Sequence, residues 1–450
     1  MPAKTLSRDL TEGNIASQLL CFVGPLFVSN VLQTVYNVVD MAVVGHYVGN
    51  VGLSAVSVCG DLMNILTFTA MGFANAGQVL ISQYVGARQP DKIKQLIGNL
   101  FTLLLAAAIG FTVIAICFGD AILGFANVPH VALPEAKAYF VICSAGLVFT
   151  YGYNAVGAIL RGMGDSKHPF IFIAFASVLN IVLDFCFVAG LGLGSAGAAL
   201  ATVISQAVSF TVSIVFLFKN REAFGFDFKL RSFVLCREAV ISLVNLGVPI
   251  ALQYGLIQCG KIMVTRWING YGVNVSAITG VGSKLNSIGL TFASAVGTSA
   301  AAMIGQCIGA GKHERVLKTI CVSGTLSVGI GTALAGIVAA FPETVFGIFT
   351  SDTDVLAMSQ SFMPVAVVLI YSSAFRAPMN GLINGSGHSQ LNLLLAILDG
   401  VVGHIGLAAL FGFVLDYGLP GLWYGNAAAG FIPFFVGIVF YASGKWKNSL

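Results

Sequence analysis

Acidic side chains inside otherwise apolar stretches are the residues of this chain best suited to do chemistry: Asp40, Asp61, Asp184 and Asp399. An ionised aspartate deep in an apolar span costs about 2.5 to 3.5 kcal/mol on membrane-insertion scales. Such residues therefore commonly hold a proton or an ion, or line a polar pathway. For Asp40 the alternative is a carboxylate near a helix end that reaches the polar interface, and we favour the functional interpretation.

Polar residues accompany Asp40 at helical spacing. Gln33, Tyr36 and Asn37 occupy positions i, i+3 and i+4, with Asp40 at i+7. These positions share one face of a helix, while valine, leucine and methionine cover the other faces. The stretch from Pro25 to Gly49 thus predicts a helix with one face turned to a polar cavity and the others turned to lipid.

Asp184 has a similar setting. Ser177, Asn180 and Asp184 stand at i, i+3 and i+7 and share a helix face. Counting from the start of this span near Pro169, Asp184 lies roughly 22 Å into the membrane at the rise of an α-helix. Asp40 counts to a similar depth, so we expect both carboxylates to belong to one site in the N-terminal half.

Two close carboxylates in a medium of low dielectric constant cannot both stay ionised, so the pair can accept a proton or share a cation. Asn154, Thr202 and Gln206 offer amide and hydroxyl partners for either form. Each of these three is equally well explained as a hydrogen-bonding contact between membrane helices.

The second half of the chain has polar groups of its own. Arg376 and Asp399 could contact a bound molecule or form a structural ion pair, and His404 lies close to Asp399 in sequence. Gln253 and Gln258 are further candidates for lining a cleft in this half.

Asp61 and Lys284 form a separate hypothesis because they occupy equivalent positions of an internal repeat with opposite charge. Residues related by such a repeat can meet where the two halves face each other, so this pair could act as a gate. The alternative is two independent polar residues that face a water-filled cleft.

Composition excludes most classes of protein. Of the 450 residues, 57% are hydrophobic and 9% are charged, and the mean hydropathy is +0.90. Soluble domains average about 25% charged residues, so the chain is predicted to be a multi-pass membrane protein. The basic residues are scattered through short loops, which argues against a nucleic-acid partner.

The nine cysteines show no metal-binding spacing, and no nucleophile and base stand at catalytic spacing. We therefore expect no metal, no cofactor and no enzymatic activity.

Apolar runs between loop signals predict twelve membrane-spanning helices and thus an all-α fold. The predicted spans are 15–45, 51–80, 95–118, 137–160, 169–190, 196–218, 238–268, 274–304, 316–340, 360–383, 390–412 and 421–443. With this count, 17 of the 22 lysines and arginines, including Lys4 and Arg8, fall on the N-terminal side of the membrane. The positive-inside rule then places both termini in the cytoplasm.

An internal repeat divides the chain. QYVGARQPDKIKQ from Gln83 matches QCIGAGKHERVLK from Gln306, and RGMGDS from Arg161 matches NGSGHS from Asn384, both at an offset of 223. The repeat predicts two six-helix lobes, 1–218 and 238–450, joined by a cytoplasmic linker at 219–237. The linker is predicted either to lie on the membrane as an amphipathic segment or to be a solvated loop. Two such lobes can rock about a central cleft and open it in turn to each side of the membrane. This alternating access favours a transporter over a channel.

The sequence resembles the multidrug and toxic compound extrusion family, MATE, and in particular its DinF-like branch. The resemblance rests on VVDMAVVGHYVG in the first span, on the two matched loops, on LRGMGDSKHP and on NIVLDFCFVAGLGLGSAGAALATVISQ. It implies export of organic, often cationic, compounds in exchange for protons or sodium through a V-shaped cleft. The residues that match the branch's N-lobe coupling network are Asp40, Asn154, Asn180, Asp184 and Thr202.

The resemblance also bears on the coupling ion and on the other transporter types of the same superfamily. Other branches carry a glutamate in the seventh span, where this chain reads Ile257 and Gln258, so proton coupling is favoured over sodium coupling. A sodium-coupled exporter and a flippase for lipid-linked precursors are the alternatives within the superfamily. We expect a monomer in the cell membrane whose only partners are the lipid bilayer and small organic substrates. The substrate cleft is expected to use Gln33, Tyr36, Asn37, Ser177, Gln206, Gln253, Gln258, Arg376 and Asp399.

Overall fold

The computed structural model describes residues 9–126, 128–350 and 352–448, and no β-strand occurs among them. Eleven helices of this part of the chain are long and apolar enough to cross a bilayer. A bent pair, α5 (Leu133–Ala145) and α6 (Leu147–Gly162), whose axes differ by 45°, makes up a further span. The predicted all-α fold with twelve spans is confirmed. Lys4 and Arg8 lie outside the described residues.

The chain divides into two compact units. Among the described residues, unit 1 holds 28–248 and unit 2 holds 9–27 and 249–448. These divisions do not coincide with the predicted lobe boundaries at 218 and 238. They fall within α1 (Ile15–Tyr47) and α10 (Arg237–Asn269), next to the prolines Pro25 and Pro249 inside these helices. A proline removes one backbone hydrogen bond from the helix, which makes it a natural place for a helix to leave one unit and join another.

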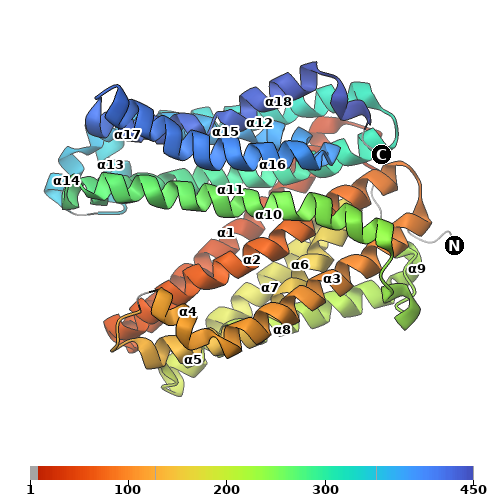
Figure 1. Ribbon diagram of the computed structural model, residues 1–450, viewed down its shortest axis with the longest axis horizontal. Helices are drawn as coiled ribbons and strands as arrows, with labels where there is room; N and C mark the ends of the chain where they lie inside the picture. The colour runs from red at the N-terminus through yellow and green to blue at the C-terminus, as the bar shows by residue number, and fades with distance from the viewer. Residues whose placement is uncertain (1–8, 127, 351, 449–450) are drawn as a thin grey trace. The chain divides into compact units, whose positions relative to one another are not determined.

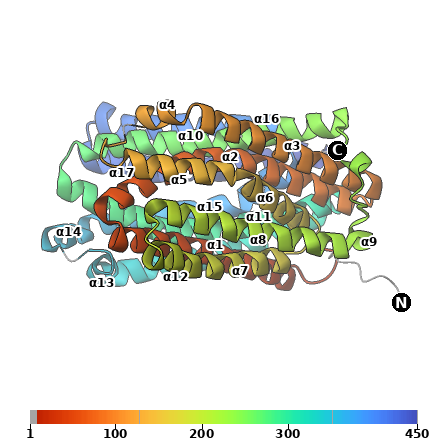
Figure 2. The ribbon, with the colours of Figure 1, turned by 90° about the horizontal axis from the view of Figure 1, so that it is seen from below.

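Unit 1 is built from long helices that pack side by side (Figures 1 and 2). Within it α2 packs along α6, and α7 packs along α8. Its further elements are α2 (Gly49–Gly86), α3 (Pro90–Cys117), α4 (Gly119–Phe125), α7 (Lys167–Asp184), the π-helix η1 (Phe185–Gly190), α8 (Gly194–Lys219), α9 (Arg221–Phe224) and the 3-10 turn η2 (Leu230–Phe233).

Unit 2 centres on α15, which packs against both α11 and α12. Its elements beyond parts of α1 and α10 are α11 (Val273–Gly309), α12 (His313–Ala340), α13 (Pro342–Gly347), α14 (Thr353–Ala357), α15 (Ser359–Ser386), α16 (Ser389–Ile397), the π-helices η3 (Leu398–Leu407) and η4 (Leu410–Val414), α17 (Gly418–Ala429), α18 (Ile432–Ala442) and η5 (Lys445–Asn448).

The internal repeat recurs at the level of helix packing. A Cβ atom placed on Gly162 of α6 would lie 2.8 Å from the carbonyl oxygen of Gln78 on α2. A Cβ atom on Gly385 of α15 would lie 2.8 Å from the carbonyl oxygen of Ala301 on α11. Gly385 follows Gly162 by 223 residues in sequence, and Ala301 follows Gln78 by the same number. The glycine of each repeated loop motif is therefore required because two helix backbones meet there without room for a side chain.

The linker between α8 and α10 docks on α3. The amide nitrogen of Cys236 donates to Asn99 Oδ1 at 2.8 Å, and Thr102 Oγ1 donates to the carbonyl oxygen of Phe233 at 2.8 Å. Phe226 is 1% exposed within this segment. Side chains of α3 thus bind the backbone of this linker. Whether it also lies on the membrane surface as an amphipathic segment stays a prediction.

Asp227 organises the same linker. It accepts hydrogen bonds from Ser232 Oγ and, at 3.1 Å, from Lys94 Nζ on α3. These two hydrogen bonds, with that from Ser232 the stronger, hold the pKa of Asp227 well below its ordinary value. The carboxylate thus ties the linker to α3 as long as it is ionised.

Candidate functional site

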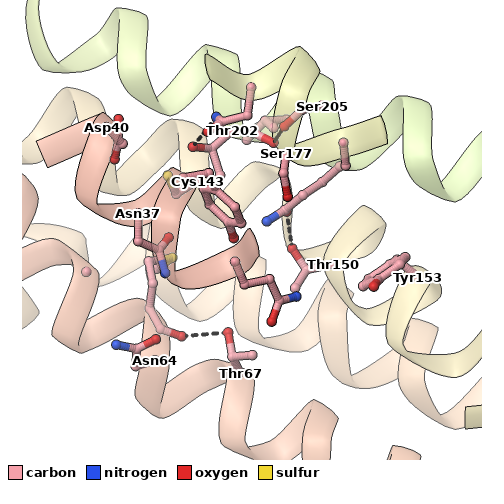
Figure 3. A pocket seen from close by; sticks show the side chains of 18 of the residues that line it. Asn37, Asp40, Asn64, Thr67, Cys143, Thr150, Tyr153, Ser177, Thr202 and Ser205 are labelled. Carbon is pink, nitrogen blue, oxygen red and sulfur yellow. Dashed lines mark hydrogen bonds between the residues drawn. The ribbon is translucent and has the colours of Figure 1, made fainter. Parts of the chain in front are cut away.

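Unit 1 contains a polar cavity of about 550 Å³. Side chains from α1, α2, α5, α6, α7 and α8 surround it, and several of them point toward one another in Figure 3. Ten of the residues singled out from the sequence line this cavity: Gln33, Tyr36, Asn37, Asp40, Asp61, Asn154, Ser177, Asn180, Thr202 and Gln206. The helical spacing around Asp40 and Ser177 therefore placed these polar faces on one cavity.

Asp40 and Asp184 are the two buried carboxylates of this unit. Asp40 is 7% exposed and lines the cavity, and its Oδ1 atom has no hydrogen-bond partner among the described residues. Asp184 is fully buried behind the lining, and within the described chain neither of its oxygens has a partner. Asp184 follows Asn180 of the cavity lining by one turn of α7, so its carboxyl group lies beside the cavity that Asp40 lines.

The arrangement leaves the negative charge uncompensated. No lysine or arginine lines this cavity among the described residues. An ionised carboxylate without a hydrogen bond or a cation is costly in a medium of low dielectric constant. A bound proton or a bound cation removes that cost, so the pair can exchange one for the other.

Polar side chains around the two acids form short contacts between helices. Asn180 Nδ2 donates to Thr202 Oγ1 at 3.4 Å, and Thr150 donates to Gln206 Oε1. The oxygens Ser177 Oγ and Asn180 Oδ1 are buried without partners in the described structure. Asn180 is thus held by α8 while its acceptor oxygen stays free for a donor.

Asn154 is less available for coupling than the resemblance implies. Its Nδ2 atom donates at 2.8 Å to the carbonyl oxygen of Thr150, one turn earlier on α6. Its side chain still lines the cavity, so its amide oxygen is the group that remains for a ligand.

The sequence analysis missed part of the lining. Tyr139 and Cys143 of α5, Tyr153 of α6, and Asn64 and Thr67 of α2 also face the cavity. The spacing of Tyr139 and Cys143 at i and i+4 is the signal that could have placed them on one face. In a chain rich in aromatic residues this signal is weak.

Asp184 occupies the last position of α7, directly before the π-helical turn η1. Asp399 has a related place, as the second residue of the π-helix η3. A π-helical turn widens the helix and leaves backbone groups less regularly paired, and such turns are frequent at functional sites.

Unit 2 contains a second polar cavity, of about 590 Å³. Gln258 and Arg376 line it, and Arg376 forms an ion pair with the fully buried Asp399, which lies outside the lining. His404 Nδ1 lies 2.7 Å from Asn426 Oδ1, and its Nε2 lies 3.9 Å from Asp399 Oδ1. Lys261 and Arg266 also line the cavity, and the sequence analysis did not select them.

Three predicted residues have other placements. Gln253 lies on α10 and Lys284 on α11, and neither lines the cavity of unit 2. Asp61 lines the cavity of unit 1. The proposed pairing of Asp61 with Lys284 therefore stays a prediction.

Comparison with known proteins identifies relatives along the whole chain. The sequence profile of the MatE family matches residues 25–186 and 249–410, which together are more than half of the chain. The probable multidrug resistance protein YpnP of Bacillus subtilis is 28% identical over 439 residues, which cover 98% of this chain and 97% of that protein. The probable multidrug resistance protein NorM of Thermotoga maritima is 24% identical over 442 residues, which cover 96% and 94% of the two chains.

Solved structures share the fold. An outward-facing multidrug resistance MATE transporter of the MOP superfamily superposes with a TM-score of 0.91 at 22% identity, covering 99% of each chain. A MOP superfamily transporter from Pyrococcus furiosus gives a TM-score of 0.89 at 22% identity and covers 98% of this chain and 99% of that one. The two profile matches coincide with the two halves of the internal repeat, so each half carries one copy of the family's unit.

Proposed function

This chain belongs to the MATE family of multidrug efflux transporters, and we propose that it exports small organic, often cationic, compounds in exchange for protons. The exchange works by alternating access, and the motifs of the chain resemble those of the DinF-like branch. Asp40 and Asp184 are the groups that take up the proton, and the bonded pair Asn180 and Thr202 lines the same cavity.

One observation carries the proposal: two carboxyl groups are buried at one cavity of unit 1 without any basic partner among the described residues. Such a pair is stable when it holds a proton or a cation and unstable when both are absent. A cationic substrate and a proton therefore compete for the same negative charge. Competition of this kind is what an exchanger needs, because it prevents the two from leaving or returning together.

Protons are favoured over sodium as the coupling ion. The seventh span carries Ile257 and Gln258 in place of the glutamate found in other branches, which removes one anionic ligand from unit 2. The free oxygens near Asp184 suit a donor such as a protonated carboxyl group. We propose that no other cofactor takes part.

The location follows from the charge pattern. We propose that the protein is a monomer in the cell membrane, with both termini in the cytoplasm as the positive-inside rule indicates. Substrate then leaves the cytoplasm while protons enter it.

Transport into vesicles tests the proposal. Purified protein is reconstituted in liposomes, and movement of a fluorescent organic cation is followed under an imposed pH gradient or an imposed sodium gradient. We expect the pH gradient to drive accumulation and the sodium gradient to have no effect. Accumulation driven by sodium alone would contradict proton coupling, and passive equilibration under both gradients would contradict exchange.

A further inference from the structure

The cavity of unit 2 has the opposite charge from that of unit 1. Lys261, Arg266 and Arg376 line it, and none of its described lining residues is acidic. The nearby acid, Asp399, is fully buried behind Arg376 and forms an ion pair with it. That pair is neutral as a whole, so Lys261 and Arg266 leave the cavity with two positive charges.

Asp399 acts on Lys261 only at longer range, because its carboxylate is already paired with Arg376. Within the described part of the chain no carboxylate lies at ion-pair distance from Lys261 or Arg266, whereas Lys94, Lys137 and Lys312 elsewhere each have one. Arg266 is exposed in the last turn of α10, close to the polar interface. Lys261 lies on the same helix, a membrane span, where a cation without an ion-pair partner is costly. An anion in the cavity would remove this cost.

Arg376 is held in place as a donor. Its Nη2 atom binds Asp399, and its side chain is 12% exposed. Its buried Nε atom donates to no acceptor among the described residues. A guanidinium group with one edge fixed by a carboxylate and another N–H unused is oriented in advance for a second anionic acceptor.

The surrounding lining suits an organic molecule. Gln258 precedes Lys261 by three residues and therefore shares its helix face. Asn286 of α11 and Asn426 of α17 add amide groups that accept or donate hydrogen bonds. The volume of about 590 Å³ falls within the usual range for small-molecule sites.

We propose that the cavity of unit 2 binds the carboxylate of an organic anion or zwitterion, with Lys261 and Arg376 as its principal contacts. The proposal rests on the proposed function in one respect, namely that the ligand is an exported compound. The chain would then select molecules that carry a carboxylate in addition to, or in place of, a positive charge.

Two dyes that differ only at a carboxyl group test this proposal. Rhodamine 110 is a zwitterion with a free carboxylate, and rhodamine 123 is its methyl ester and a simple cation. Binding of each to the purified full-length protein in detergent is measured by fluorescence polarisation. This equilibrium measurement requires no pH gradient, so its outcome is independent of whether proton coupling is demonstrated.

The informative quantity is the ratio of the two dissociation constants. We expect the wild-type protein to bind rhodamine 110 more tightly than rhodamine 123. Lys261→Gln should weaken rhodamine 110 binding about tenfold, equivalent to about 1.4 kcal/mol, and leave rhodamine 123 within about twofold. Lys318→Gln is the matched control, because Lys318 is exposed on α12 and lies outside the cavity.

Three results would overturn the proposal. These are saturable binding of neither dye, equal affinity of the wild-type protein for both dyes, and equal effects of Lys261→Gln on both. Misfolding of Lys261→Gln is excluded beforehand by comparing its unfolding temperature with that of the wild-type protein. The double variant Arg376→Gln with Asp399→Asn removes the buried pair without a net change of charge, and it should also lower affinity for rhodamine 110 alone.

Discussion

Replacing Asp184 by asparagine should uncouple substrate movement from the proton gradient while leaving the protein folded. Asp184 is fully buried, and neither of its oxygens has a partner among the described residues. Asparagine has nearly the same shape, but it cannot take up and release a proton. The change therefore removes the exchangeable proton without opening a hole in the packing around α7.

The size of the effect follows from the energy of the gradient. One pH unit corresponds to about 1.4 kcal/mol per proton, which supports about a tenfold concentration ratio of substrate for each exchanged proton. With the membrane potential held at zero by valinomycin and equal potassium, wild-type liposomes should accumulate a fluorescent cation up to about tenfold per pH unit for each exchanged proton. Liposomes with Asp184→Asn should reach a ratio of about one.

The assay needs two controls. Asp120→Asn changes an exposed acid that pairs with Lys137 on the surface, and it should keep the wild-type accumulation ratio. The unfolding temperature of Asp184→Asn should not fall below that of the wild-type protein, because the variant removes an unpaired buried carboxyl group. A folded Asp184→Asn protein that still accumulates the cation about tenfold per pH unit would refute the reasoning.

Further predictions concern the gate and the linker. Asp61→Lys and Lys284→Asp should each impair transport, and their combination should restore it in the same liposome assay; absence of rescue would exclude the pairing. Because hydrogen bonds from Ser232 and Lys94 lower the pKa of Asp227, its ionised form stabilises the docked linker above its unfolded pKa of about 4. That contribution is lost as the pH falls toward the lower folded pKa, so Asp227→Asn should speed amide exchange in residues 220–236 at neutral pH and make no difference in strong acid. Gly98→Ala places a methyl group against the carbonyl oxygen of Ser232 and should also speed this exchange, whereas unchanged exchange would show that the linker is not docked there.

The spans and the polar cavity of unit 1 could be predicted because both depend on local patterns. Twenty-residue apolar runs determine the spans, and the spacing of Gln33, Tyr36, Asn37 and Asp40 determines which face of α1 is polar. The offset between repeated motifs also indicated that the chain contains two related halves. These features require no knowledge of which distant segments meet.

Features that depend on contacts between distant segments were not predictable. The linker follows α8 in sequence but binds Asn99 and Thr102 of α3. The residues of the linker do not indicate that α3 is the helix it contacts. Lys312 and Arg315, which the charge count treats as loop residues, bind the segment that includes Thr11 and Gly13. A basic residue has the same sequence signal whether it faces water or holds another segment.

Lys261 illustrates a different limit. The positive-inside rule uses only the basic residues of loops, so it gives no role to a lysine inside a span. No motif in the sequence marks Lys261 as a binding residue either. The structure places this lysine on the same cavity as Arg376, which the sequence did indicate. That none of the described lining residues is acidic could be recognised only once the lining was known.

Proton release on substrate binding tests the central claim most directly. A fluorescent organic cation is added to purified protein in weakly buffered detergent solution, and the released protons are counted with a pH indicator. The account predicts about one proton released for each cation bound by the wild-type protein, and none by a variant with both Asp40→Asn and Asp184→Asn. Equal proton release by the wild-type protein and by a folded double variant that still binds the cation would contradict it.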